Sequence, residues 1–247
     1  LQYKDVARKI EKIHILLEES GVKKGDKIAI CGRNSSHWGV TFLAVVTYGA
    51  VIVPILHEFK ADNVHNIVNH SEAKLLFVGD VVWENLDENA MPNLEGIVLV
   101  NDFSVLVSRS EKLTYAREHL NEMFGHKYPK NFRKEHINYH QDQPEEMLVL
   151  NYTSGTTSFS KGVMLPSRAL WSNVEFGKEK LGKILKPGDS VVSMLPMAHM
   201  YGLAFEFLYE FCSGCHVYFL TRMPSPKIIL QAFAEVKPKI VIAVPLI

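Results

Sequence analysis

The chain has 247 residues, of which 47% are hydrophobic and 22% are charged. This composition is that of an ordinary globular protein and excludes a disordered, collagen-like or coiled-coil chain. Lys and Arg together number 27, as do Asp and Glu, so the formal net charge is zero and no overall field attracts nucleic acid. Three cysteines are too few for a disulfide framework and indicate a reducing compartment.

The first part of the chain alternates predicted helices with short apolar strands. The uncharged stretch 34–57 is interrupted by Tyr48-Gly49 and Pro54, so we interpret it as a buried helix, a turn and a buried strand, and not as a membrane span. Strands that are continuous apolar runs separated by helices predict βαβ units and mainly parallel sheets covered on both faces. The predicted helices are 3–17, 36–48 and 62–70, and the predicted strands are 27–31, 51–54, 74–78 and 96–100.

A polar segment over residues 104–143 differs from its surroundings, with a predicted helix at 111–124 and a basic, His-rich stretch at 126–140. After it the alternation resumes, with predicted strands at 147–152, 190–195, 216–220 and 240–244 and helices at 168–181, 203–211 and 225–236. We therefore predict an α/β fold with mainly parallel β-sheets flanked by helices in two lobes. The predicted divisions are a first lobe at 1–103, a connecting segment at 104–143 and a second lobe at 144–247.

One loop, between residues 151 and 163, carries the most informative pattern in the chain. It follows a predicted buried strand, which places it at the edge of a parallel sheet, where ligands bind. Gly155 allows the backbone to approach an anion closely, and Lys161 adds a positive charge. Hydroxyl groups that can donate to phosphate oxygens belong to Thr153, Ser154, Thr156 and Thr157. This set predicts a site for the triphosphate of a nucleotide.

Other interpretations of this loop fit less well. A Walker A loop needs Gly directly before its Lys and Ser or Thr directly after it, but Ser160 and Gly162 flank Lys161. Ser158 and Lys161 match the S-x-x-K signature of a serine nucleophile, which begins a helix. Gly162 and the apolar residues before Pro166 indicate a strand instead, and the chain contains no Lys-Thr-Gly. A polar surface loop without a ligand is the remaining alternative.

Four motifs in the same order resemble those of the adenylate-forming superfamily, which includes acyl-CoA synthetases, luciferases and peptide-synthetase adenylation domains. The segment from Tyr152 to Val163 resembles the family's phosphate loop, [YF]-T-S-G-T-T-G-x-P-K-G-V. Leu195–Gly202 resembles L-P-x-x-H-x-x-G, and Tyr48–Pro54 resembles A-G-A-x-x-x-P. Lys237–Leu246 looks like the strand that precedes the acyl and adenine pockets. The residues around His199 look most like fatty acyl-CoA synthetases.

The resemblance implies a two-step reaction in which a carboxylate attacks the α-phosphate of ATP, and the thiol of CoA then displaces AMP from the acyl adenylate. It implies that Lys161 and the neighbouring hydroxyls hold the β- and γ-phosphates with Mg²⁺. The nucleotide-binding residues it implies are Thr153, Ser154, Gly155, Thr156, Thr157, Lys161 and Gly162, with Thr156 at the metal. His199 and Gly202 would lie at the acyl pocket, with Lys161 and His199 as the catalytic residues. The expected partners are therefore ATP, a fatty acid and CoA.

Two departures from the family pattern lie within the phosphate loop. Ser158 stands where the family has glycine, and Ser160 stands where it has proline. A serine that must adopt positive φ costs about 1 kcal/mol or more, and the loss of proline loosens a loop. These departures keep open a homologue that binds nucleotide or acyl chains without turnover. Another carboxylate ligase of the superfamily is the second alternative to a fatty acid–CoA ligase.

The family's later motifs have no counterpart before Ile247. These later motifs carry a Mg²⁺-binding Glu, a ribose-binding Asp, a hinge and a Lys on a small C-terminal domain. We therefore expect the chain to be an N-terminal piece that does not form a thioester alone.

Two cysteine and histidine patterns have less specific meanings. Cys212 and Cys215 followed by His216 spell C-x-x-C-H, the haem-attachment motif, but the surrounding apolar residues favour a buried helix-to-strand turn. His136 and His140 have the spacing of half a zinc site, and the sequence suggests no acidic or thiol partner for them.

The basic and aromatic stretch 126–134 has the composition of a surface that touches anionic lipid or the phosphates of CoA, although a solvated face is the simpler interpretation. The chain opens with a charged amphipathic segment and no signal peptide. With the low cysteine content, this predicts a cytoplasmic protein, and a fatty-acid substrate leaves peripheral membrane association open.

Overall fold

A computed structural model describes residues 1–153, 161–222 and 224–244, and its internal contacts divide the chain into two compact units. The first unit comprises Leu1–Gly32 and His37–Pro166, and the second comprises Arg33–Ser36 and Ser167–Ile247. The division into lobes at residues 103 and 143 stays a prediction. No helix within the described ranges is both long enough and apolar enough to cross a membrane.

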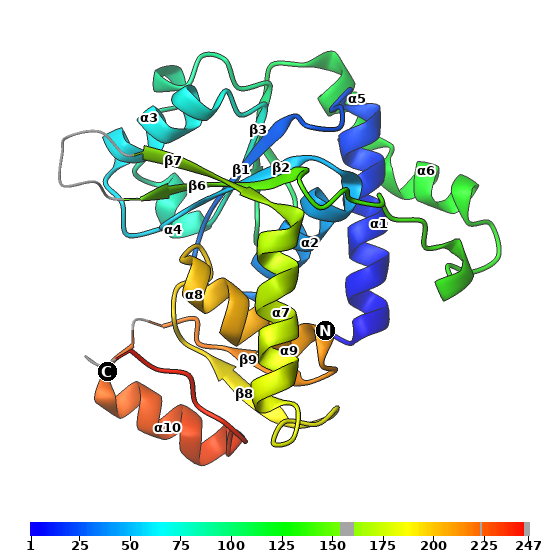
Figure 1. Ribbon diagram of the computed structural model, residues 1–247. Coiled ribbons are helices and arrows are strands. Elements are labelled where there is room, and N and C mark those ends of the chain that lie inside the picture. Colours follow the sequence, from blue (N-terminus) through cyan, green and yellow to red (C-terminus); the bar gives the residue numbers. More distant parts are fainter. Residues whose placement is uncertain (154–160, 223, 245–247) are drawn as a thin grey trace. The chain divides into compact units, whose positions relative to one another are not determined.

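The first unit is built around a sheet in which seven strands are described, in the order β5-β4-β3-β1-β2-β6-β7 (Figure 1). The pairs among β1, β2, β3, β4 and β6 are parallel, whereas the edge strands β5 and β7 pair antiparallel with their neighbours. This mostly parallel arrangement confirms the predicted α/β class. The strands are β1 (Lys27–Cys31), β2 (Val51–Ile55), β3 (Leu75–Val78), β4 (Gly96–Leu99), β5 (Val105–Ser108), β6 (Met147–Thr153) and β7 (Lys161–Pro166).

Helices cover both faces of this sheet, as fully apolar strands require. One face packs on α3, where Val64, Ile67 and Val68 join alternate residues of the central strands in a buried cluster. Figure 1 shows α1 and α2 on the other side of the sheet. The helices of this unit are α1 (Tyr3–Glu19), α2 (Ser36–Tyr48), α3 (Ala61–Ser71), α4 (Asp80–Trp83), α5 (Glu111–Glu118) and α6 (Leu120–Lys127), with short 3₁₀ turns η1 (Glu88–Ala90) and η2 (Lys134–His136).

The helix that we predict over residues 111–124 is wrong as a single element, because α5 ends at Glu118 and α6 begins at Leu120. His119 between them has φ −101° and ψ 6°, outside the helical range. The Nδ1 atom of His119 lies 3.0 Å from the carbonyl oxygen of Tyr115, and the imidazole ring stacks on the Tyr115 ring. The His119 backbone N–H donates to the same carbonyl oxygen at 3.0 Å, so the break lies in the backbone angles of His119 itself.

The second unit contains a parallel pair of strands, β8 (Ser190–Ser193) and β9 (His216–Phe219), with helices α7 (Ser167–Leu181) and α10 (Pro226–Val236). The predicted helix at 203–211 belongs to a longer run made of α8 (Met200–Leu203), the π-helical turn η3 (Ala204–Leu208) and α9 (Tyr209–Cys212).

The strand predicted at 240–244 is wrong. Among the described residues, this end of the chain makes one backbone bond to the sheet, from the Lys239 N–H to the Ser190 carbonyl at 2.8 Å. One bond does not make a ladder, although the Ile240 side chain still packs on the apolar cluster of this unit.

Candidate functional site

The hydroxyl-rich loop joins the antiparallel strands β6 and β7 in the first unit. Thr153 at the end of β6 is the register partner of Lys161 at the start of β7. Because β6 runs parallel to β2, Thr153 lies at the carboxyl end of the parallel strands, the edge at which α/β sheets bind ligands. Both residues are exposed, and no carboxylate among the described residues pairs with the Lys161 ammonium. A hydroxyl and a free cation therefore stand at the two ends of the loop.

Tyr152 anchors the end of β6 to α3. Its side chain is 5% exposed, and its hydroxyl lies 2.7 Å from Nδ1 of His70. Burial raises the pKa of the Tyr152 phenol, so the hydroxyl keeps its proton in this hydrogen bond with the imidazole. A Cβ on Gly162 would lie 3.3 Å from Cζ of Tyr152, so glycine there lets β7 pass close over the tyrosine ring. The start of the loop is thus fixed by a buried polar contact.

In the second unit, residues 194–199 form a turn directly after β8. Oε2 of Glu206 accepts hydrogen bonds from the backbone N–H groups of Met194, at 2.8 Å, and Leu195, at 2.6 Å. Nδ2 of Asn34 donates to the carbonyl oxygen of Leu195 at 2.7 Å, and Oδ1 of Asn34 accepts from the N–H of Met197 at 2.9 Å. Two buried side chains therefore satisfy four backbone groups of this turn.

His199 ends the turn and is the N-cap residue of α8. Its backbone N–H donates to the carbonyl of Pro196 at 3.0 Å, and its ring Nδ1 accepts from the N–H of Tyr201 at 3.3 Å. In a neutral imidazole whose Nδ1 accepts, the proton resides on Nε2. His199 is exposed, so its Nε2–H is a donor available to a ligand.

Gly202 packs against the backbone of the same turn. A Cβ at this position would lie 2.6 Å from the Pro196 carbonyl oxygen and 3.1 Å from Cβ of Leu195. A backbone atom cannot rotate away as a side chain can, so the close approach of α8 to the turn requires glycine.

The sequence-predicted site residues fall into two groups. Thr153, Lys161 and Gly162 lie in the first unit, and His199 and Gly202 lie in the second. The remaining predicted residues lie outside the described part of the chain: Ser154, Gly155, Thr156 and Thr157, together with the departures Ser158 and Ser160.

Sequence reasoning missed the buried side chains that hold the two segments. Glu206 carried a usable signal, because it is an acidic residue in an otherwise apolar run and is 2% exposed. Asn34 and His70 carried no comparable signal, since polar residues at helix ends are common.

The cysteine pattern forms a helix-to-strand turn as predicted, but the turn is only partly buried, because Cys212 is exposed. Ser213 and Gly214 lie between α9 and β9, and Gly214 has φ +76°. Cys215 is 2% exposed, and burial raises the pKa of its thiol to about 11. Burial also raises the pKa of the Cys212 thiol. Both groups are protonated thiols at neutral pH, which is the opposite of a reactive pair.

The expectation that the histidine pair lacks an acidic partner is wrong for His140. Its Nε2 lies 2.7 Å from Oε1 of Glu146 and 3.9 Å from Oδ1 of Asp142. Its Nδ1, however, lies 3.0 Å from the Lys24 ammonium, which has only protons to donate. Nε2 of His140 therefore carries the proton and donates a hydrogen bond to Glu146, while Nδ1 accepts one from Lys24. Neither ring nitrogen has a lone pair free for a metal. Among the described residues, His136 does not join this group.

Aromatic residues in the basic stretch pack on one another. The ring of Tyr128 lies 5.0 Å from that of Phe132 and 5.2 Å from that of His136. Lys127 forms an ion pair with Glu11 of α1. Contact of this stretch with lipid or CoA stays a prediction.

Comparison with known proteins gives consistent matches. A family model described as AMP-binding enzyme matches residues 1–247. Long chain acyl-CoA synthetase 3 of Arabidopsis thaliana is 26% identical over 246 residues, which are 98% of this chain and 36% of that protein. Long-chain-fatty-acid–CoA ligase 1 of Homo sapiens is 29% identical over 228 residues, which are 87% of this chain and 31% of that protein. The chain thus spans about a third of the length of these relatives.

A solved structure shows the same fold. The anthranilate CoA ligase AuaEII, crystallised in complex with anthranoyl-AMP, superposes with a TM-score of 0.79 at 20% identity, over 96% of this chain and 43% of that one. The fold and the matched family confirm the resemblance that the four motifs indicate. The chain belongs to the family of AMP-binding enzymes.

Proposed function

We propose that this chain supplies the nucleotide-phosphate loop and the acyl-pocket turn of a fatty acid–CoA ligase. The observation that carries the proposal is the pairing of Thr153 with Lys161 at the ligand-binding edge of the sheet. The names of the curated relatives support the acid class, since both act on long-chain fatty acids.

The first step brings together two anions, a carboxylate and a triphosphate, so it depends on cations and hydrogen-bond donors placed on the phosphates. In our proposal the Lys161 ammonium and the Thr153 hydroxyl bind β- and γ-phosphate oxygens. The exposure of Lys161 fits this role, because no carboxylate among the described residues forms an ion pair with its ammonium. The loop residues Ser154, Gly155, Thr156 and Thr157 would complete the site, where Thr156 would hold a Mg²⁺ ion that neutralises phosphate charge.

The reaction then proceeds in two displacements. A carboxylate oxygen of the fatty acid attacks the α-phosphorus of ATP, and pyrophosphate leaves with the electron pair of the broken P–O bond. The sulfur of CoA next attacks the acyl carbonyl carbon, the thiol proton is lost, and AMP leaves. We assign His199 to the binding of the acid in the first step, in which its Nε2–H donates to a carboxylate oxygen. Gly202 shapes the wall of the acyl pocket.

Two alternatives make different predictions. Another carboxylate ligase of the family would release pyrophosphate with short-chain or aromatic acids instead of long-chain ones. A homologue without turnover, an alternative that Ser158 and Ser160 keep open, would bind ATP and release no pyrophosphate with any acid.

The test measures pyrophosphate release by the full-length protein with short-, medium- and long-chain fatty acids and an aromatic acid. We expect the fastest release with long-chain acids. Lys161→Ala should slow release by about 100-fold, the scale of losing one group that stabilises developing charge. Lys183→Ala is the matched control, because Lys183 is an exposed lysine outside the loop. Equal rates for the two variants, or no release from a folded protein that binds ATP, would overturn the proposal.

A further inference from the structure

Glu206 is an unusual residue for its position in the fold. It lies in the π-helical turn η3, within a run of buried apolar side chains, and is 2% exposed. π-Helical turns are rare and frequently occur at functional sites. A carboxyl group in such surroundings is costly unless its hydrogen bonds are made.

The carboxyl group of Glu206 makes its hydrogen bonds with one oxygen. Oε2 accepts from the N–H groups of Met194 and Leu195, while Oε1 is buried and has no partner among the described residues. Burial raises the pKa of Glu206 to about 8. One of the two carboxyl oxygens thus lacks a hydrogen bond, which offsets the stabilisation that the other oxygen gives to the fold. The specific effect of Glu206 is to fix the backbone of the turn at Met194 and Leu195.

Hydrogen bonds connect the part of the turn that Glu206 holds to the backbone of His199. Leu195 is held on one side by Glu206 and on the other by Asn34, and the Pro196 carbonyl accepts from the His199 N–H at 3.0 Å. Gly202 then lies against the same Pro196 carbonyl. The backbone from Met194 to His199 therefore has few degrees of freedom left.

We infer that Glu206 is a positioning residue, which fixes the turn at residues 194–199 and thereby aims the imidazole of His199. The assignment of a reacting carboxylate to His199 rests on the proposed function. The control of the turn by Glu206 does not, and the two are measured separately.

Glu210 provides a matched control four residues further along the chain. It is 1% exposed and burial raises its pKa to about 8, as for Glu206. Among the described residues, however, it makes no hydrogen bond to the turn at 194–199. A general effect of removing a buried carboxyl group would appear in both Glu206→Met and Glu210→Met, whereas an effect on the turn would appear only in the first.

The first experiment is amide hydrogen exchange of the peptide that covers residues 194–203. We expect Glu206→Met to speed exchange by about tenfold or more, because two N–H groups lose their acceptor. Glu206→Gln should leave exchange near the wild-type rate, since its amide oxygen can accept both bonds. If Glu206→Met does not fold, Glu206→Ser replaces it, because the serine hydroxyl is too short to reach the turn.

The second experiment compares kcat and KM for acyl-adenylate formation in the full-length protein. Glu206→Met should lower kcat by about 10-fold or more and leave KM for ATP unchanged, because a misplaced group near the reacting atoms costs rate. Glu206→Gln should restore kcat, and Glu210→Met should retain it.

The outcomes separate the two claims. Unchanged exchange in Glu206→Met, or the same loss in Glu206→Gln as in Glu206→Met, would overturn the inference. Faster exchange with an unchanged kcat would also overturn it, since the position of the turn would then have no effect on the role of His199 in acyl-adenylate formation. A wild-type protein without pyrophosphate release would contradict the proposed function, and the exchange result would still decide whether Glu206 controls the turn.

Discussion

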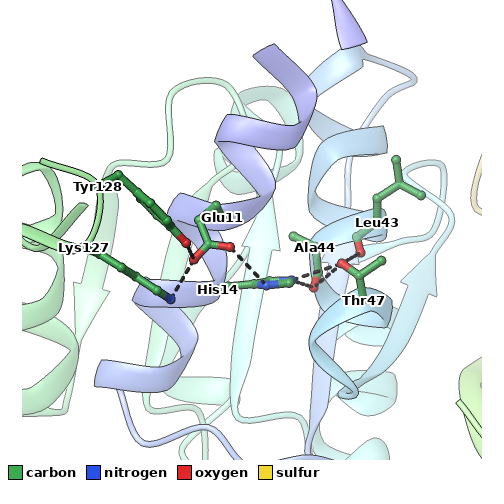
Figure 2. Close-up of polar contacts among 7 residues, drawn as sticks. All are labelled: Glu11, His14, Leu43, Ala44, Thr47, Lys127 and Tyr128. Atoms are coloured by element: carbon green, nitrogen blue, oxygen red, sulfur yellow. Dashed lines mark hydrogen bonds and ion pairs between the residues drawn. The ribbon is translucent and has the colours of Figure 1, made fainter. Parts of the chain in front are cut away.

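The Tyr128 hydroxyl donates to Oε1 of Glu11 at 2.7 Å, which ties the end of α6 to the middle of α1. Figure 2 shows that the same oxygen also accepts from the Lys127 ammonium, at 2.7 Å. The Glu11 side chain is 6% exposed, whereas that of Lys127 is 47% exposed. Burial and the Glu11 carboxylate raise the pKa of Tyr128, so its hydroxyl remains a donor.

Tyr128→Phe should therefore lower the free energy of unfolding by about 1.5–3 kcal/mol, the range for a hydrogen bond to a charged group. Lys127→Met should cost less than about 1 kcal/mol, since an exposed ion pair is screened by solvent. Urea denaturation measures both. Tyr115→Phe serves as the control, because Tyr115 is 55% exposed and should show no change. A loss for Lys127→Met that exceeds the loss for Tyr128→Phe would contradict this account.

His14 lies on the other side of Glu11, and it should make folding sensitive to acid. Its Nε2 lies 2.9 Å from the Ala44 carbonyl oxygen and 3.1 Å from Oγ1 of Thr47 (Figure 2). Burial lowers the pKa of His14 from 6.5, and the nearby Glu11 offsets only part of this effect. The unfolded chain then binds a proton at a higher pH than the folded chain, so stability is lost as the pH falls below 6.5.

The measurement is the free energy of unfolding between pH 7 and pH 5, compared for wild type and His14→Gln. The variant should remove up to about 1.4 kcal/mol per pH unit from the slope, the limit for one proton. Gln is suited to the comparison because its amide keeps a donor for the Ala44 carbonyl. His37 contributes to both curves, since burial also lowers its pKa. Parallel curves would show that His14 does not couple protonation to folding.

The order of strands and helices in the first unit could largely be predicted from the sequence, because each buried strand is an uninterrupted apolar run. The break at His119 could not, because it is a change of backbone angles at one residue that no glycine or proline marks. The segment at 240–244 has the apolar pattern of a strand, yet whether it pairs depends on backbone bonds to β8 that no local pattern encodes.

The site shows the same limit. The composition of the loop predicts Lys161 as a phosphate-binding residue, and the resemblance of Leu195–Gly202 to a family motif predicts His199, because both patterns are local in the sequence. The register that sets Thr153 opposite Lys161 comes from pairing across the hairpin. The bonds that Met194 and Leu195 donate to Glu206 span 12 and 11 positions of sequence, so only the folded turn reveals them.

The buried pair Glu206 and Glu210 should give a pH dependence of opposite sign to that of His14. Burial raises the pKa of each carboxyl group from 4.5 to about 8. The folded chain therefore keeps protons that the unfolded chain has lost, and their contribution to stability declines as the pH rises from 4.5 through 8. Glu206→Gln cannot ionise, so it should be more stable than wild type at pH 9, and the difference should shrink toward pH 5. Chemical denaturation at the two pH values tests this, and a variant that is less stable than wild type at pH 9 would be evidence against a protonated Glu206.

Gly202→Ala should destabilise the second unit, because its new Cβ would lie 2.6 Å from the Pro196 carbonyl oxygen. Overpacking against a backbone atom costs about 1–3 kcal/mol. Gly125→Ala is the matched control, since Gly125 lies in α6 and a Cβ there would meet nothing within 4 Å. That control should instead raise stability by about 0.5–1 kcal/mol, because alanine favours a helix over glycine. Denaturant unfolding followed by far-UV circular dichroism gives both values. Equal effects of the two substitutions would mean that the contact between α8 and the turn is looser than the geometry requires.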